Sequence, residues 1–255
     1  MLSFVPVGAI FDLDDTLLDN QPASHDSGLH EQARLLAVRE AGERHGIDVL
    51  ASLSAELNEH VLDRAPDHTI YGATWQIFYE LGIAADRNVD RGNSLLQEVV
   101  TRKEELYEPL MREFGAPVRK AVEFVKAMHV LTGGKLAIAT GAKRSVVHEF
   151  LQSAGMTDYF KEECIFGHGD YERSKPDPQS FDLAFHSLGL PEAARSHVIA
   201  FEDDPKGIVS AKDAGLYVAA ITTRFDRETL LGTEPAPDTV AGGFVDFADA
   251  IGITL

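Results

Sequence analysis

A short apolar run that stops on two closely spaced aspartates constrains this chain more than any other stretch. Residues 7–11 read Val-Gly-Ala-Ile-Phe, which predicts a short buried strand, and the run ends at Asp12 and Asp14. Two carboxylates two positions apart cannot both be packed in an apolar core, so we expect them in the crevice where open α/β sheets bind ligands. Either a divalent cation relieves their repulsion, or the strand simply runs into an Asp-rich turn. Because the pattern continues as Asp-x-Asp-x-Thr to Thr16, we favour a Mg²⁺ site that contains a nucleophile.

The segment that follows has helical spacing and shows no convincing strand before residue 115. Its apolar residues recur every three or four positions, and this pattern predicts helices over residues 24–45, 52–63, 70–81 and 93–113. Pro109 is expected to kink or shorten the last of these helices. We therefore expect an all-helical domain over residues 19–115, inserted after the first strand of a core domain that comprises residues 1–18 and 116–255.

After residue 117 the pattern alternates between helix and strand. Strands are predicted at residues 135–139, 164–166, 197–201 and 217–221. Helices are predicted at residues 118–131, 144–154, 178–188 and 206–214, and a weaker apolar stretch at 244–251 ends the chain. Strands that alternate with helices indicate a parallel sheet covered by helices. The predicted fold class is thus α/β: a Rossmann-like parallel sheet core with an inserted all-helical domain.

Three further polar positions follow strand ends, where open α/β sheets place their functional residues. Thr140 and Gly141 offer a hydroxyl and a backbone N–H to an oxyanion, although a threonine before a helix can also serve as its N-cap. Lys175, between Ser174 and two prolines, could balance the charge of the carboxylates, or it could be an ordinary solvated lysine.

The third position is a run of acids after the strand at 197–201. Glu202 and Asp203 can supply further oxygens to a Mg²⁺ ion. Asp204 is interpreted instead as the N-cap of the next helix.

The charge balance limits the classes of partner. With 41 acidic and 23 basic side chains the net charge is −18, which repels phosphate backbones and anionic membranes, so nucleic acid and membrane are not expected partners. The single cysteine, Cys164, lies in an apolar run and is expected in the core. One cysteine excludes an internal disulfide, and no signal-peptide pattern or membrane-length apolar run is evident, so we expect a cytoplasmic protein.

The joint order of these motifs resembles that of the haloacid dehalogenase-like hydrolase superfamily. It is similar to subfamily I with a helical cap after the first strand, the branch that includes phosphoglycolate phosphatase and β-phosphoglucomutase, and the resemblance covers nearly the whole chain. The first motif corresponds to residues 12–17, the second to Thr140, the third to Lys175 and the fourth to residues 201–203.

This resemblance implies a role for each matching residue. Asp12 would attack phosphorus and form an aspartyl-phosphate, and Asp14 would act as general acid and then general base. The implied Mg²⁺ ligands are Asp12, the backbone carbonyl of Asp14, Asp203 and, directly or through water, Glu202. The implied phosphoryl ligands are Thr140, Gly141 and Lys175.

Residues that would contact the rest of the substrate are less sharply defined. Lys143 and Arg144 could bind a second anionic or hydroxylated group, or could form a solvated first helical turn. Within the cap, the polar residues that could face the crevice are His25, Arg64, His68 and Trp75. Trp75 is expected rather to pack the core of the cap.

The resemblance implies a Mg²⁺-dependent phosphatase, monomeric or homodimeric, that acts on a small phosphorylated metabolite. A β-phosphoglucomutase-like phosphotransferase is the first alternative, but its cap histidine would fall at Ser24, one position before His25. A phosphonate hydrolase would need a cap lysine, and there is none between Asp19 and Arg102. A non-catalytic regulator is the remaining alternative, against which the complete set of motifs argues.

Overall fold

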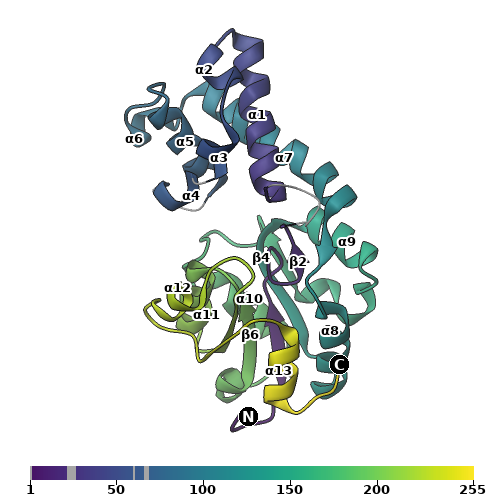
Figure 1. Cartoon of the computed structure of the whole chain (residues 1–255). Coiled ribbons are helices and arrows are strands. Elements are labelled where there is room, and N and C mark those ends of the chain that lie inside the picture. The colour runs from purple at the N-terminus through teal and green to yellow at the C-terminus, as the bar shows by residue number, and fades with distance from the viewer. Residues whose placement is uncertain (1, 22–26, 60, 66–68) are drawn as a thin grey trace. The chain divides into compact units, whose positions relative to one another are not determined.

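The computed structural model describes residues 2–21, 27–59, 61–65 and 69–255 (Figure 1). Contacts divide the chain into two compact units. One comprises residues 1–19 and 116–255, and the other comprises residues 20–115.

The first unit is built on a parallel sheet that has six strands in the described part of the chain. The strands are β1 (Gly8–Phe11), β4 (Leu136–Lys143), β5 (Ile165–His168), β6 (Val198–Glu202), β7 (Tyr217–Ile221) and β8 (Thr239–Ala241). Their spatial order is β5-β4-β1-β6-β7-β8, and every neighbouring pair is parallel. The predicted parallel α/β sheet is therefore confirmed.

Helices follow the strands and cover both faces of this sheet. They are α8 (Ala121–Leu131), α9 (Arg144–Ser153), α10 (Gln179–Ser187), α11 (Pro205–Asp213), α12 (Arg227–Leu231) and α13 (Phe244–Ile251). Short 3₁₀ turns occupy η1 (Thr157–Tyr159), η2 (Glu162–Cys164) and η3 (Glu192–His197). The predicted helices match α8 to α11 to within a few residues, and the weak terminal stretch forms α13.

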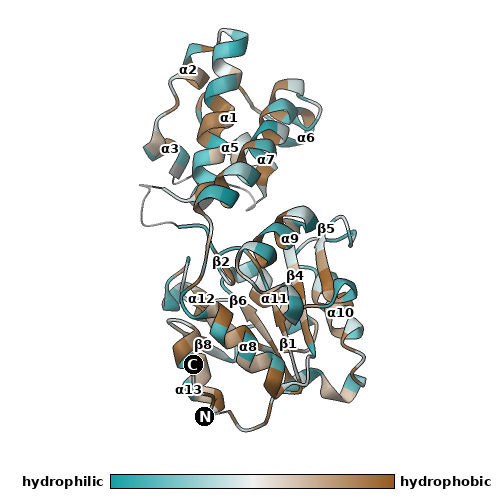
Figure 2. Ribbon diagram, turned by 90° about the vertical axis from the view of Figure 1, so that its right-hand side faces the viewer, coloured by the Kyte–Doolittle hydropathy of each residue, from teal (hydrophilic) through white to brown (hydrophobic). Residues whose placement is uncertain are grey.

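The two faces of the sheet bury different side chains because residues alternate along each strand. On one face Ile10 packs in a cluster with Phe181 of α10 and Ile208 of α11. On the other face Phe11 stacks on Phe201, with ring centroids 4.9 Å apart, and aromatic residues of α8 and α13 pack against this pair. Figure 2 shows the resulting hydrophobic colouring along the central strands. This core holds the strand ends rigidly in place. Cys164 is buried in it, as expected.

The unit of residues 20–115 is helical. Its helices are α1 (Leu29–His45), α2 (Asp48–Ala51), α3 (Ala55–Glu59), α4 (Val61–Arg64), α5 (Ile70–Glu80), α6 (Arg87–Asp90) and α7 (Ser94–Phe114). The helix predicted at 52–63 corresponds to α3 and α4, whose described residues are 55–59 and 61–64. Pro109 lies inside α7, which continues to Phe114, so the expectation that it shortens the helix was wrong. Trp75 packs in the core of this unit, as expected, and its indole N–H donates to Asp90 (3.1 Å).

A two-stranded antiparallel ribbon lies at the boundary of the first unit. It pairs β2 (Leu18–Asp19) with β3 (Ala116–Pro117), in the register Leu18 to Pro117 and Asp19 to Ala116. The chain therefore leaves and re-enters this unit on adjacent strands. The sequence gives no sign of these two short strands, because each is only two residues long.

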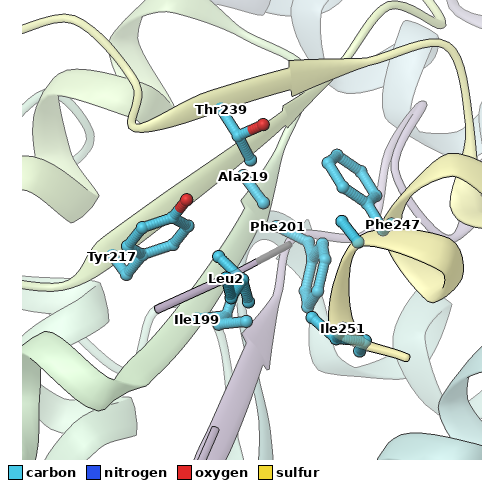
Figure 3. A pocket seen from close by; sticks show the side chains of 9 residues that line it. Leu2, Ile199, Phe201, Tyr217, Ala219, Thr239, Phe247 and Ile251 are labelled. Atoms are coloured by element: carbon cyan, nitrogen blue, oxygen red, sulfur yellow. The ribbon is translucent and has the colours of Figure 1, made fainter. Parts of the chain in front are cut away.

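The terminal residues close one side of the sheet. The backbone N–H of Leu2 donates to the carbonyl of Ala250 in α13 (3.0 Å), which brings the two ends of the chain together. Beside them is an apolar hollow of about 100 Å³, shown in Figure 3. Its walls include Leu2, Ile199, Tyr217 and Ile251. Among the described residues, no helix has the length and apolarity needed to cross a membrane.

Candidate active site

The sequence motifs meet at the carboxyl ends of three adjacent strands. Asp12 directly follows β1, Thr140 lies near the end of β4 on one side, and Glu202 ends β6 on the other. The backbone N–H of Asp12 donates to the carbonyl of Phe201 (3.0 Å), which continues the β1–β6 pairing up to the site. Parallel strands place their carboxyl ends at one edge, so residues nearly 200 positions apart become neighbours.

Three buried carboxylates converge at this edge. One oxygen each from Asp12, Glu202 and Asp203 lies within 4.8 Å of the other two. The three residues are 7%, 1% and 2% exposed. Burial, together with the neighbouring negative charges, raises the pKa of Asp12 and of Asp203 well above the usual value. Burial also raises the pKa of Glu202.

Lys175 reaches into this group of acids from the segment after β5. Its ammonium donates to Asp12 Oδ1 (2.6 Å), Glu202 Oε1 (2.5 Å) and the carbonyl of Ala139 (2.9 Å), which uses all three of its N–H groups. Burial alone would lower the pKa of Lys175, but the two carboxylates outweigh it and hold the pKa above its ordinary value. The alternative of a solvated lysine is excluded, because only 14% of the side chain is exposed.

The charge and the donor set fit a divalent cation. With all three carboxylates ionised, this buried group and the Lys175 ammonium carry a net charge of −2, and Mg²⁺ binds through carboxylate oxygens. Within the described part of the chain, Oδ2 of Asp12 and Oδ2 of Asp203 accept no hydrogen bond, so each can serve as a ligand. Both oxygens of Glu202, by contrast, already accept hydrogen bonds.

Backbone N–H groups of the following residues hold the Glu202 carboxylate in place, in addition to Lys175. Its Oε2 accepts from the N–H groups of Asp203 (3.1 Å) and Asp204 (3.2 Å) at the start of α11. Asp204 is the N-cap of that helix, as predicted, and accepts from the N–H of Lys206 (2.8 Å). Gly207, in the first turn of the helix, leaves the space in which the Glu202 carboxylate lies. A Cβ atom at that position would stand 1.9 Å from Glu202 Oε1.

We expect Gly207→Ala to destabilise the protein by about 2–4 kcal/mol, because the new methyl group must displace a buried, fully hydrogen-bonded carboxylate. Thermal unfolding of the variant measures the effect. Gly92→Ala is the matched control, since a Cβ there meets no atom within 4 Å. An unfolding temperature of Gly207→Ala equal to that of Gly92→Ala would contradict this assignment.

The first motif is also tied to the neighbouring strand ends through Thr16 and Asp15. The hydroxyl of Thr16 donates to Asp203 Oδ1 (2.9 Å). Asp15 has a positive φ of 55°, its N–H donates to the carbonyl of Leu18 (2.7 Å), and its own carbonyl accepts from the hydroxyl of Thr223. Asp14 is half-buried, and its negative charge contributes to the raised pKa of Asp12. The roles of Asp14 and Asp12 in one reaction stay predictions.

Thr140 and Gly141 lie where the sheet opens beside Lys175. Thr140 is buried, its Oγ1 accepts from the N–H of Ala142 (3.1 Å), and the N-cap of α9 is Lys143, so Thr140 is not the helix cap. Gly141 is exposed, with open space where a side chain would be. Tyr171, which the sequence analysis did not select, donates its hydroxyl to the carbonyl of Thr140 (2.7 Å).

The two basic residues that could contact the rest of the substrate, Lys143 and Arg144, have different surroundings in the structure. Lys143 is exposed at the end of β4. The guanidinium of Arg144, however, is taken up by Asp170 (Nε to Oδ2, 2.8 Å), by Glu162 (Nη1 to Oε1, 3.0 Å) and by the carbonyl of Ile165. These contacts give Arg144 a role in joining β4 to β5, and its contact with the substrate stays a prediction.

Of the polar residues in the helical unit that could face the crevice, the structure describes Arg64 but neither of the two histidines. Arg64 pairs with Glu80 through two N–H groups (2.8 and 3.1 Å). His25 and His68 lie outside the described residues, as does Ser24, so their predicted roles stay predictions.

Comparison with known proteins identifies the family. A family model described as haloacid dehalogenase-like hydrolase matches residues 8–215, which is most of the chain. The fold and the acidic site at its strand ends define a hydrolase of this class. The chain belongs to the haloacid dehalogenase-like hydrolase family, as the order of its motifs suggested.

Individual relatives carry phosphatase names. Glycerol-1-phosphate phosphohydrolase 2 of Saccharomyces cerevisiae is 29% identical over 43% of this chain and 44% of its own length, so the chain matches less than half of that relative. The phosphoglycolate phosphatase of Yersinia pestis is 26% identical over 96% of this chain and 93% of its own. A predicted phosphoglycolate phosphatase from Haemophilus somnus has a similar solved structure, with a TM-score of 0.69 and 17% identity over 97% and 99% of the chains.

Proposed function

We propose that this protein is a Mg²⁺-dependent phosphatase that hydrolyses a small phosphorylated metabolite through an aspartyl-phosphate on Asp12. The observation that carries the proposal is the convergence of Asp12 with Asp203 and Glu202 within 4.8 Å, beside a lysine that contacts Asp12 at 2.6 Å. A buried carboxylate fixed in position by a lysine, with one oxygen open, is suited to nucleophilic attack on phosphorus.

The proposed reaction has two steps on this chain's own residues. In the first, a carboxylate oxygen of Asp12 forms a bond to phosphorus, the ester P–O bond breaks, and Asp14 gives a proton to the leaving oxygen. In the second, Asp14 takes a proton from a water molecule whose oxygen attacks phosphorus. The bond between phosphorus and Asp12 then breaks, which releases inorganic phosphate and restores Asp12.

The surrounding groups bind and orient the phosphoryl oxygens. The Thr140 hydroxyl and the Gly141 N–H would donate to them, and the positive charge of Lys175 would stabilise the charge that develops in transfer. Mg²⁺, held by Asp12, Asp203 and the Asp14 carbonyl, would neutralise further negative charge when bound. Because both Glu202 oxygens are engaged, we assign Glu202 to positioning Lys175 and to contact with the metal through water.

Two further assignments concern the substrate. The relatives named above act on glycerol phosphate and phosphoglycolate, which supports a small phosphorylated metabolite as the substrate class. The helical unit of residues 20–115 is proposed as a cap that excludes water and selects the substrate. Lys143 is proposed as a contact to the non-reacting part of the substrate.

Phosphate release from p-nitrophenyl phosphate, with a panel of phosphorylated metabolites, tests the proposal. We expect turnover with Mg²⁺, a fall of at least about tenfold after treatment with EDTA, and recovery when Mg²⁺ is added back. Isomerised hexose phosphate without free phosphate would point to a phosphotransferase. No release from any substrate at high protein concentration would contradict the proposal and favour a regulatory protein.

A further inference from the structure

Beyond the motif residues, one side chain is placed to control the segment that binds the phosphoryl group. This segment, residues 140–142, lies outside the regular pairing of the sheet. Ala139 pairs with Phe166, but the next pairing joins Lys143 to His168, so three residues of β4 lie opposite the single residue Gly167 of β5. On the other side, β1 ends at Phe11, which pairs with Ile138. Residues 140–142 therefore lie at an irregularity of the β4–β5 ladder, beyond the last residue that β1 pairs with β4.

The loop after β5 restrains this irregular segment. Tyr171 donates its hydroxyl to the carbonyl of Thr140 (2.7 Å). The adjacent residue, Asp170, accepts through Oδ2 from Arg144 Nε (2.8 Å) and from the N–H of Gly167 (2.8 Å). Neighbouring residues of one loop thus hold the segment on both flanks, at residue 140 and at residue 144.

The space around the segment is equally restricted. A Cβ atom on Gly167 would stand 2.7 Å from the carbonyl of Ala142, so the two strands approach closely at this point. Tyr171 is half-buried, burial raises its pKa, and the charges of Lys175 and Asp12 act on its hydroxyl. The hydrogen bond of the tyrosine hydroxyl goes to the backbone of the segment, at the Thr140 carbonyl.

We infer that Tyr171 is a positioning residue: by holding the Thr140 carbonyl, it orients the Thr140 hydroxyl and the Gly141 N–H toward the phosphoryl oxygens. Thr140 Oγ1 already accepts from Ala142, so its own hydrogen remains to donate to the substrate. A small rotation of the peptide between Thr140 and Gly141 would turn both donors, the Thr140 hydroxyl and the Gly141 N–H, away from the phosphoryl oxygens. The inference rests on the proposed function, because it takes the phosphoryl group as the ligand of this segment.

Tyr171→Phe removes one oxygen and keeps the ring, so it tests the hydrogen bond alone. We expect kcat/KM for p-nitrophenyl phosphate to fall about three- to tenfold, the loss that a single misplaced hydrogen bond produces in a transition state. Tyr217→Phe is the matched control. Tyr217 begins β7, at the opposite end of the strands, beside the hollow of Figure 3, and its hydroxyl makes no hydrogen bond with the described residues.

A double-mutant cycle with Thr140→Ala distinguishes positioning from a purely structural role. If Tyr171 acts through Thr140, Tyr171→Phe should cost less in the Thr140→Ala background than in the wild type. A lower unfolding temperature with unchanged kcat/KM, or strictly additive losses, would overturn the inference and leave the proposed function intact. A wild-type protein that releases no phosphate would overturn both.

Discussion

Asp12→Asn should abolish phosphate release, lowering kcat by at least about a thousandfold, because an amide oxygen is a poor nucleophile toward phosphorus and cannot form the aspartyl-phosphate. The fold should not suffer. Asp12 is one of three clustered buried carboxylates, of which only Asp12 and Glu202 contact Lys175, and removing its charge relieves repulsion on Asp203 and Glu202. We therefore expect the unfolding temperature in EDTA to equal or exceed that of the wild type.

Asp213→Asn is the matched control for this experiment. Asp213 is an exposed residue near the end of α11, and the same loss of charge there should leave both kcat and unfolding temperature unchanged. Turnover by Asp12→Asn at the wild-type rate would refute the nucleophile assignment. A large loss of stability would refute the electrostatic description of the site.

The second large effect is expected for Lys175→Met, and it concerns stability as much as catalysis. Lys175 is the only cation within ion-pairing distance of Asp12 and Glu202 among the described residues. Its removal leaves three buried carboxylates uncompensated, and loss of one partner of such a group costs about 3–5 kcal/mol. Phosphate release should fall to background, because the developing charge on the phosphoryl group loses its counterpart.

Urea denaturation in EDTA and in Mg²⁺ measures the stability of this variant. We expect Mg²⁺ to raise the unfolding midpoint of Lys175→Met more than that of the wild type, since the cation meets a more negative site. Lys126→Met, on the exposed side of α8, provides the control for removing a lysine without breaking a buried pair. Equal midpoints for the two variants would show that Lys175 does not balance the acids.

The features that could be predicted from sequence are those that a continuous local pattern of residues determines. The strand before Asp12 is four fully buried residues, and β7 has the predicted bounds, because long apolar runs between turn residues have few other interpretations. The order of Asp12, Thr140, Lys175 and Asp203 along the chain indicated one site, because parallel strands bring their carboxyl ends to one edge.

Other features depend on contacts that no local pattern records. The strand β8 has three residues at the sheet edge and is defined by its pairing with β7. For Arg144 the sequence left a substrate contact and a solvated helical turn open, because its partners, Asp170 and Glu162, lie in segments that no local pattern connects to it. Gly207 and Tyr171 were missed for the same reason, since each matters through a residue far away in the sequence. For Gly207 the sequence did contain one signal, namely that a glycine stands five positions after Glu202 in the first turn of a predicted helix.

The ribbon of β2 and β3 has a consequence for how such proteins diversify. Asp19 and Ala116 are paired neighbours, which is the spacing that an ordinary two-residue hairpin turn connects. Every hydrogen bond described in the site is made by residues outside 20–115. The helical segment could therefore be exchanged between two paired residues without changing a residue of the described site. Under the proposed cap function, shortening it, replacing it or recombining it with a foreign segment would alter which molecules are admitted while the groups at the strand ends stay the same.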